Sequence, residues 1–79
     1  MKLYFVNSEG VQRLICEPKT WREANDVISD FLEKHNYKSY YRRTNLYTDE
    51  WEIDVGSHTE FFRLKDIPDD VKEEVIGNE

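Results

Sequence analysis

The sequence has few of the residues from which disulfides, metal clusters and phosphate-binding loops are built. Its 79 residues include one cysteine, Cys16, which excludes an internal disulfide and any multi-cysteine metal site. The three glycines are isolated from one another, so no Gly-rich phosphate-binding motif is present. No apolar run approaches the roughly 20 residues of a membrane span, and residues 3–6 are too short for a signal-peptide core. We expect one small cytoplasmic domain with no cofactor.

Acidic residues are concentrated toward the C-terminal end. The chain carries 17 Asp and Glu against 11 Lys and Arg, a net charge of -6. Within residues 66–79, six carboxylates face a single cation, Lys72, so this segment accounts for -5 of that charge. Binding of duplex nucleic acid by the whole domain is therefore electrostatically unfavourable.

Residues 50–65 predict a β-hairpin. Apolar and acidic residues alternate along its first arm, which gives a buried face and a wet face: Trp51, Ile53 and Val55 against Glu50, Glu52 and Asp54. A two-residue turn with Gly56 opposite Thr59 would set the register. It places Ile53 against Phe62 and Trp51 against Leu64, with Glu52 against Arg63 and Glu50 against Lys65. A one-residue shift would bury charge, so we expect this register.

The N-terminal half predicts a hairpin followed by an amphipathic helix. Residues 2–6 and 11–16 are strand-like, and Asn7 and Gly10 lie in the turn between them. For residues 20–35, Thr20 and Glu23 form a capping box, and Asn36 suits a left-handed C-cap. The helix carries one apolar stripe, made of Trp21, Ala24, Val27, Ile28, Phe31 and Leu32.

The remaining segments complete a two-layer α+β domain. Residues 37–43 predict a third strand by their aromatic content, and residues 67–76 a short acidic helix with Val71, Val75 and Ile76 on its inner side. We expect a mostly antiparallel sheet of about five strands, ordered ββαβββ, packed on one long helix. The predicted core cluster is Trp51, Ile53, Phe62, Leu64, Phe31 and Ile28. The second face of the sheet should remain open.

No combination of residues predicts an enzyme. Asp54, His58 and Glu60 are metal-ligand types that lie close in sequence, but in the expected register their side chains diverge. His35 ends the apolar stripe of the helix, and no nucleophile with a supporting base can be proposed. We therefore expect no catalytic, metal-binding or cofactor-binding residues. A small hydrolase or metal-dependent enzyme is the least favoured alternative.

Two surfaces are candidates for binding a protein partner. One is the acidic C-terminal helix with Asp69, Asp70, Glu73 and Glu74, which can present carboxylates to a basic groove as phosphates would. The other combines the basic-aromatic segment 37–43 and the open sheet face, with Tyr40, Arg42 and Phe61 as contact residues. The alternatives are a nucleic-acid-contacting module that uses residues 37–43 and a structural homo-oligomer; a homodimer is compatible with the open face.

Two strings of residues resemble a group of phage proteins. They are Tyr-Lys-Ser-Tyr-Tyr-Arg at 37–42 and Ile-Asp-Val-Gly-Ser-His-Thr-Glu-Phe-Phe at 53–62. With the preceding helix, residues 20–64 are similar to small uncharacterised accessory proteins of phages and prophages of Gram-positive bacteria. The resemblance carries no catalytic residues. It implies a protein that binds and modulates host machinery, as anti-CRISPR proteins do.

Overall fold

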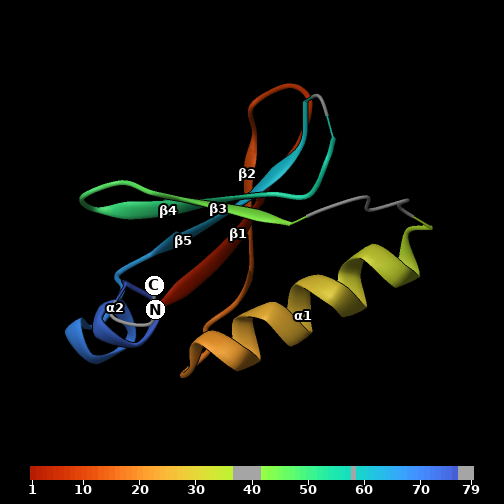
Figure 1. Cartoon of the computed structure of the whole chain (residues 1–79). Helices are drawn as coiled ribbons and strands as arrows, with labels where there is room; N and C mark the ends of the chain where they lie inside the picture. The colour runs from red at the N-terminus through yellow and green to blue at the C-terminus, as the bar shows by residue number, and fades with distance from the viewer. Residues whose placement is uncertain (37–41, 58, 77–79) are drawn as a thin grey trace.

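The computed structural model describes residues 1–36, 42–57 and 59–76 (Figure 1). Five strands and two helices follow one another along the chain as β1 (Lys2–Val6), β2 (Gln12–Cys16), α1 (Trp21–Lys34), β3 (Arg43–Leu46), β4 (Glu50–Asp54), β5 (Phe61–Lys65) and α2 (Asp69–Ile76). This order confirms the predicted ββαβββ arrangement with a short C-terminal helix.

The strands form one antiparallel sheet in the order β2-β1-β5-β4-β3. Strand β5 is therefore central, although it comes last in the sequence. Its pairing with β1 joins residues about sixty positions apart, with Leu3 opposite Leu64 and Phe5 opposite Phe62. The N-terminal strand is thereby held between two neighbours.

The predicted register of the β4–β5 hairpin is confirmed, but its predicted turn is wrong. Trp51 lies opposite Leu64 and Ile53 opposite Phe62, and the ladder ends there. Gly56 and Thr59 belong to neither strand, because the Asp54 carboxylate accepts a hydrogen bond from the Gly56 N–H and turns the chain early. The hydroxyl of Ser57 then accepts from the Glu60 N–H at 3.2 Å. His58 lies outside the described residues.

Both helices pack on the same face of the sheet (Figure 1). Ala24, Ile28 and Leu32 of α1 and Val71 of α2 belong to one buried cluster with the inward residues of the strands: Leu3, Trp51, Ile53, Phe62 and Leu64. The predicted core is confirmed except that Phe31 is only half-buried. The Phe31 ring packs edge-on against Phe62, with 5.3 Å between the ring centroids.

Helix α1 begins and ends at the predicted residues. The Thr20 hydroxyl accepts a hydrogen bond from the Glu23 N–H at 3.0 Å. The Glu23 carboxylate reaches back to the N–H of Lys19, one residue earlier than a standard capping box. At the other end, Asn36 adopts the left-handed conformation with φ of 54°.

Strand β3 overlaps the predicted range 37–43 only at the C-terminal end of that range. Strand β3 is Arg43–Leu46. Arg43 was predicted to be in the strand, residues 44–46 were predicted to be a connection, and Arg42 precedes the strand. Residues 37–41 of the predicted strand lie outside the described residues. The pairing of β3 with β4, in which Thr44 faces Ile53 and Leu46 faces Trp51, selects these residues although they have little strand propensity of their own.

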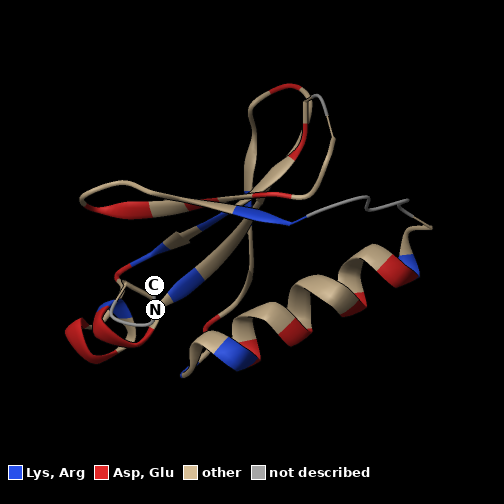
Figure 2. Cartoon of the chain, viewed as in Figure 1, with Lys and Arg blue, Asp and Glu red and all other residues tan. Residues whose placement is uncertain are grey.

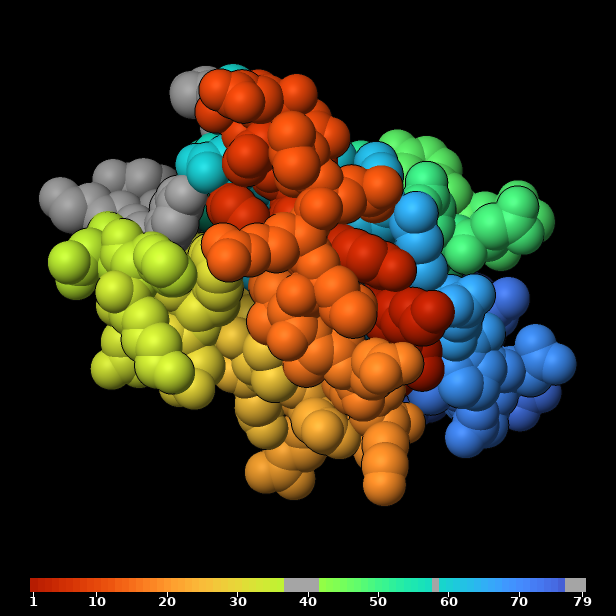
Figure 3. All heavy atoms as spheres, turned by 180° about the vertical axis from the view of Figure 1, so that it is seen from behind, coloured from red at the N-terminus to blue at the C-terminus, as the bar shows by residue number. Residues whose placement is uncertain are grey.

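Strand β2 contains one extra residue. Leu3 pairs with Cys16 but Tyr4 pairs with Leu14, so Ile15 is bulged out of the ladder. The bulge places Leu14 and Gln12 on the face opposite the helices. Seen from behind, β2 and the residues leading into α1 cross the middle of the surface, between the C-terminal half of α1 and α2 (Figure 3).

None of the described helices is both long and apolar enough to cross a bilayer.

Truncation of the two packed phenylalanines should have unequal effects. Phe62→Ala removes a ring that is fully buried in the cluster and should cost about 3–5 kcal/mol of unfolding free energy. Phe31→Ala should cost less, about 2 kcal/mol, because its ring is half-exposed. Urea unfolding followed by tryptophan fluorescence measures both values. Tyr47→Ala is the control at an exposed position, and equal losses for the two phenylalanines would contradict the packing.

Candidate binding surfaces

The sheet face opposite the helices carries a mixed set of polar, charged and aromatic side chains. Strand pairing assigns these residues to it: Lys2, Tyr4, Val6, Gln12, Leu14, Arg43, Asn45, Glu50, Glu52, Asp54, Phe61, Arg63 and Lys65. We call this surface the open face. Neither helix covers it (Figure 1), so the expectation that one face of the sheet stays open is confirmed for the described residues.

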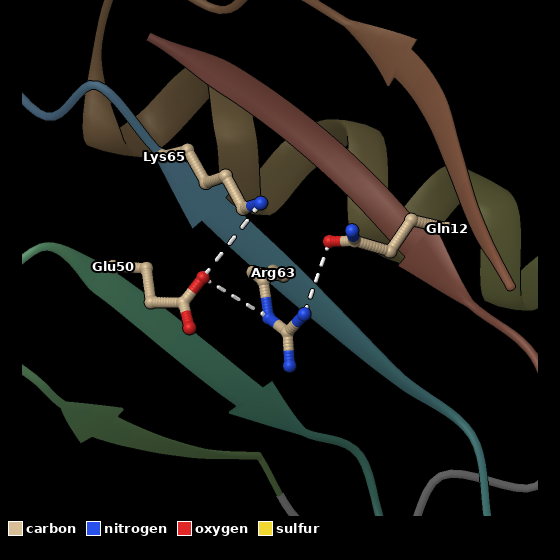
Figure 4. A network of polar contacts seen from close by, with 4 residues as sticks. All are labelled: Gln12, Glu50, Arg63 and Lys65. Carbon is tan, nitrogen blue, oxygen red and sulfur yellow. Dashed lines mark hydrogen bonds and ion pairs between the residues drawn. The ribbon is translucent and has the colours of Figure 1, made fainter. Parts of the chain in front are cut away.

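A network centred on Glu50 joins three strands of the open face. One oxygen of the Glu50 carboxylate lies 3.3 Å from Nε of Arg63 and 4.0 Å from Nζ of Lys65. Arg63 also donates from Nη1 to the side-chain oxygen of Gln12, across β1, at 3.0 Å. Figure 4 shows these four side chains in front of the strands with α1 behind them. Glu52 is the residue directly opposite Arg63 in the ladder, yet the ion pair of Arg63 found among the described residues is with Glu50.

Two aromatic rings of the open face lie beneath these cations. Nζ of Lys65 is 5.3 Å from the centroid of the Tyr4 ring, and the guanidinium carbon of Arg63 is 5.2 Å from that of Phe61. Both distances are within cation–π range. Phe61, a predicted contact residue, is half-buried on this face. Tyr4 and Gln12 were not predicted as surface residues, because their face depends on β1 pairing with β5 and on the bulge in β2.

Helix α2 presents the predicted carboxylates. Asp69, Asp70, Glu73 and Glu74 are all exposed, while Val71 is buried and Val75 packs at the edge of the core. Ile76 is 50% exposed, so its predicted place in the inner stripe is wrong. Two turns of helix allow only Val71 and Val75, four residues apart, to face the domain.

Charge is distributed unequally between the two layers of the fold. The five strands contain five Lys or Arg and three Asp or Glu, a net charge of +2. The two helices contain three Lys or Arg and eight Asp or Glu, a net charge of -5. In Figure 2 the carboxylates run along α1 and α2, whereas acidic residues in the sheet are confined to β4. The helical layer is therefore a broad acidic surface.

Arg42, predicted as a partner contact, is held against α1. Its guanidinium donates to the Asn25 side-chain oxygen at 3.1 Å and to the Ser29 hydroxyl at 3.0 Å. Desolvation by these neighbours lowers the pKa of Arg42 from its ordinary value, but the group remains charged at neutral pH. Tyr40, the other contact predicted in this segment, lies outside the described residues.

Of the three residues considered as metal ligands, the structure describes Asp54 and Glu60. The Asp54 carboxylate accepts from the Gly56 N–H, Glu60 is half-buried beyond the turn, and His58 is not among the described residues. Within residues 1–36, 42–57 and 59–76, no group of three or more His, Cys, Asp or Glu is placed to hold a metal ion. The absence of a metal site and of catalysis stays a prediction.

Comparisons with protein-family models, with curated proteins and with solved structures gave no match to this chain.

The two carboxylates of β4 that face the hairpin cations should contribute differently to stability. Glu50→Gln removes the charge that two cations share and should cost about 1 kcal/mol, a modest value because the pairs are partly exposed. Glu52→Gln should change stability by less than about 0.5 kcal/mol, since among the described residues Glu52 accepts only one long hydrogen bond, from Asn45 at 3.5 Å. Urea unfolding of both variants in dilute protein, where self-association does not contribute, is the measurement. A larger loss of stability for Glu52→Gln than for Glu50→Gln would contradict a network centred on Glu50.

The thiol of Cys16 should react slowly. Burial, reinforced by the negative charge of Glu23, raises the pKa of the Cys16 thiol, so less thiolate is present at about pH 8 than in the unfolded chain. Because the unfolded thiol ionises first, stability should fall as pH rises above the ordinary thiol pKa. Iodoacetamide labelling should be slower in the folded state, and Glu23→Gln should accelerate it. Equal rates for folded and unfolded protein would contradict this.

Proposed function

We propose that this chain is a non-enzymatic binding protein whose acidic helical layer docks on a basic surface of another protein. The observation that carries the proposal is the segregation of charge, -5 on the two helices against +2 on the five strands. Carboxylates scattered over the whole surface would keep the protein in solution equally well, so solubility does not require them to be concentrated on one layer. Their concentration on one layer provides a directed field that steers a cationic partner.

Helix α2 is the centre of this surface. Its four carboxylates are exposed, and Val71 anchors the helix to the core. Carboxylates four residues apart on a helix lie about 6 Å apart along its axis, a spacing similar to that of successive phosphates on a nucleic-acid strand. A basic groove that normally receives nucleic acid is therefore the partner surface with the best chemical fit.

The resemblance of residues 20–64 to phage accessory proteins supports the same proposal. Short acidic accessory proteins of phages often act by binding host machinery, and a host nucleic-acid-binding protein would have the basic groove that α2 requires. In this proposal the chain is an inhibitor or modulator that occupies the groove in place of nucleic acid.

The first experiment identifies the partner. The immobilised domain is incubated with a bacterial lysate treated with nuclease, which removes nucleic acid that could bridge two proteins. We expect a basic, nucleic-acid-binding protein to be retained and to elute as salt is raised. Retention of single-stranded DNA in place of a protein would favour the alternative, a nucleic-acid-contacting module.

The second experiment assigns the surface through two variants with the same change in charge. Asp69→Asn, Asp70→Asn and Glu73→Gln are combined on α2, and Asp26→Asn, Asp30→Asn and Glu33→Gln on α1. Association of the captured partner should slow roughly tenfold for the α2 variant at low salt and much less for the α1 variant. Surface plasmon resonance at two ionic strengths measures this. Glu74 is left unchanged because it already has an interaction within the domain.

Two outcomes would contradict the assignment. Equal slowing in both variants would mean that the charge of the whole helical layer matters and that α2 has no special role. Unchanged binding of the α2 variant, with loss of binding in Phe61→Ala, would move the binding surface to the open face and leave α2 as a solubilising segment. Circular dichroism of each variant controls for folding, since first-turn carboxylates also support the helix dipole.

A further inference from the structure

We infer that the open face binds the open face of a second copy of this chain, forming a two-fold symmetric dimer. This inference does not depend on the proposed function, because the open face and α2 lie on opposite sides of the sheet. The occupant is identified from the arrangement of charge on the face, which is complementary to itself.

The self-complementarity follows from the register of β4 and β5. Glu52 lies opposite Arg63 and Glu50 opposite Lys65, so a row of carboxylates runs beside a row of cations. Consider a two-fold axis that runs parallel to these strands, above the open face and midway between β4 and β5. Rotation about this axis places β4 of the second copy over β5 of the first, and β5 of the second copy over β4 of the first. It places Glu52 of one copy over Arg63 of the other, and Glu50 over Lys65. Each contact then occurs twice, as an isologous interface requires.

Glu52 is the residue with most to gain from such a contact. It is half-buried on the open face, and its contact within the described chain is a long hydrogen bond from the Asn45 amide, 3.5 Å. No ion pair of Glu52 is found among the described residues, because Arg63 is directed to Glu50 and Gln12. A cation from a second copy would compensate this partly desolvated carboxylate.

The same rotation gives the outer strands polar and aromatic partners. In the ladder, Tyr4 of β1 lies beside Arg63, and Asn45 of β3 lies beside Glu52. The rotation that places Glu52 of one copy over Arg63 of the other therefore also places Asn45 over Tyr4. The phenol of Tyr4 can donate to the amide oxygen of Asn45 in the other copy. Twisted sheets pack at about 30° to one another, so the contacts nearest the axis, those of β4 and β5, should be the most closely retained.

Single-stranded nucleic acid is the competing occupant, because bases can stack on Tyr4 and Phe61. The carboxylates of β4 oppose it. Phosphates beside β5 would lie next to Glu50 and Glu52 on the neighbouring strand. A second copy converts the same carboxylates from a repulsive feature into an attractive one.

Charge exchange between copies tests the inference. Sedimentation velocity of the intact chain over a range of concentrations should show a monomer–dimer equilibrium. Glu52→Lys and Arg63→Glu should each weaken the dimer at least about tenfold, because each places like charges in contact across the axis. An equimolar mixture of the two variants, one of them fluorescently labelled, should form a heterodimer at least as stable as the parent dimer, since every contact between the two is then attractive.

The controls carry the same charge changes away from the open face. Glu33→Lys on α1 and Arg13→Glu on the helix side of β2 should leave the dimer unchanged, and circular dichroism verifies the folding of every variant. A chain that remains monomeric at all concentrations would overturn the inference. So would a dimer that is insensitive to both variants, or a mixture that fails to associate. Binding of labelled oligothymidylate by the monomer, lost in Arg63→Glu, would assign the face to nucleic acid.

Discussion

The register between β4 and β5 is the constraint on which the rest of the structure depends. Trp51 and Ile53 are almost completely buried against Leu64 and Phe62 on one face, and α1 can pack only where these side chains form a continuous surface. Because successive residues of a strand point to opposite faces, the same register determines which charges lie together on the other side. The chemistry of the open face is thus a consequence of how the core is buried.

Local patterns predicted most of the elements, because the information for them lies within a few residues. Alternation along residues 50–65 was sufficient for the hairpin register, and Thr20 with Asn36 was sufficient for the ends of α1. These features depend on side-chain periodicity and on hydrogen bonds between near neighbours. The fold class followed from them.

Features that depend on distant pairing were not predictable in the same way. The residues of β3 have weak strand propensity and are selected by the exposed edge of β4. The place of Tyr4 on the open face requires both the β1–β5 pairing and the absence of a helix on that side. The prediction of the hairpin turn was wrong because the Asp54 side chain competes with the ladder for the backbone N–H of Gly56. For the candidate surfaces, the exposed carboxylates of α2 and the pairing of Glu50 with Lys65 were foreseen, while the pairing of Glu50 with Arg63 was not.

The two proposals have a joint consequence for binding strength. In a dimer joined through the open face, the two α2 helices lie on the outer sides of the assembly, and each keeps its carboxylates accessible. A partner that is itself repeated, or that has two basic grooves, would meet two linked sites. The second contact would then form at a high effective concentration, so modest affinity at each helix would suffice.

The bulge at Ile15 has an effect at the boundary of the sheet. An uncovered edge strand exposes backbone N–H and C=O groups that can recruit the edge of another molecule and continue the sheet without limit. In β2 the extra residue interrupts the regular spacing of these groups, and β3, at the opposite edge, is only four residues long and begins with Arg43. Both boundaries are therefore poor templates for unlimited addition of strands. The open face is then the part of the sheet where association can end after a single step.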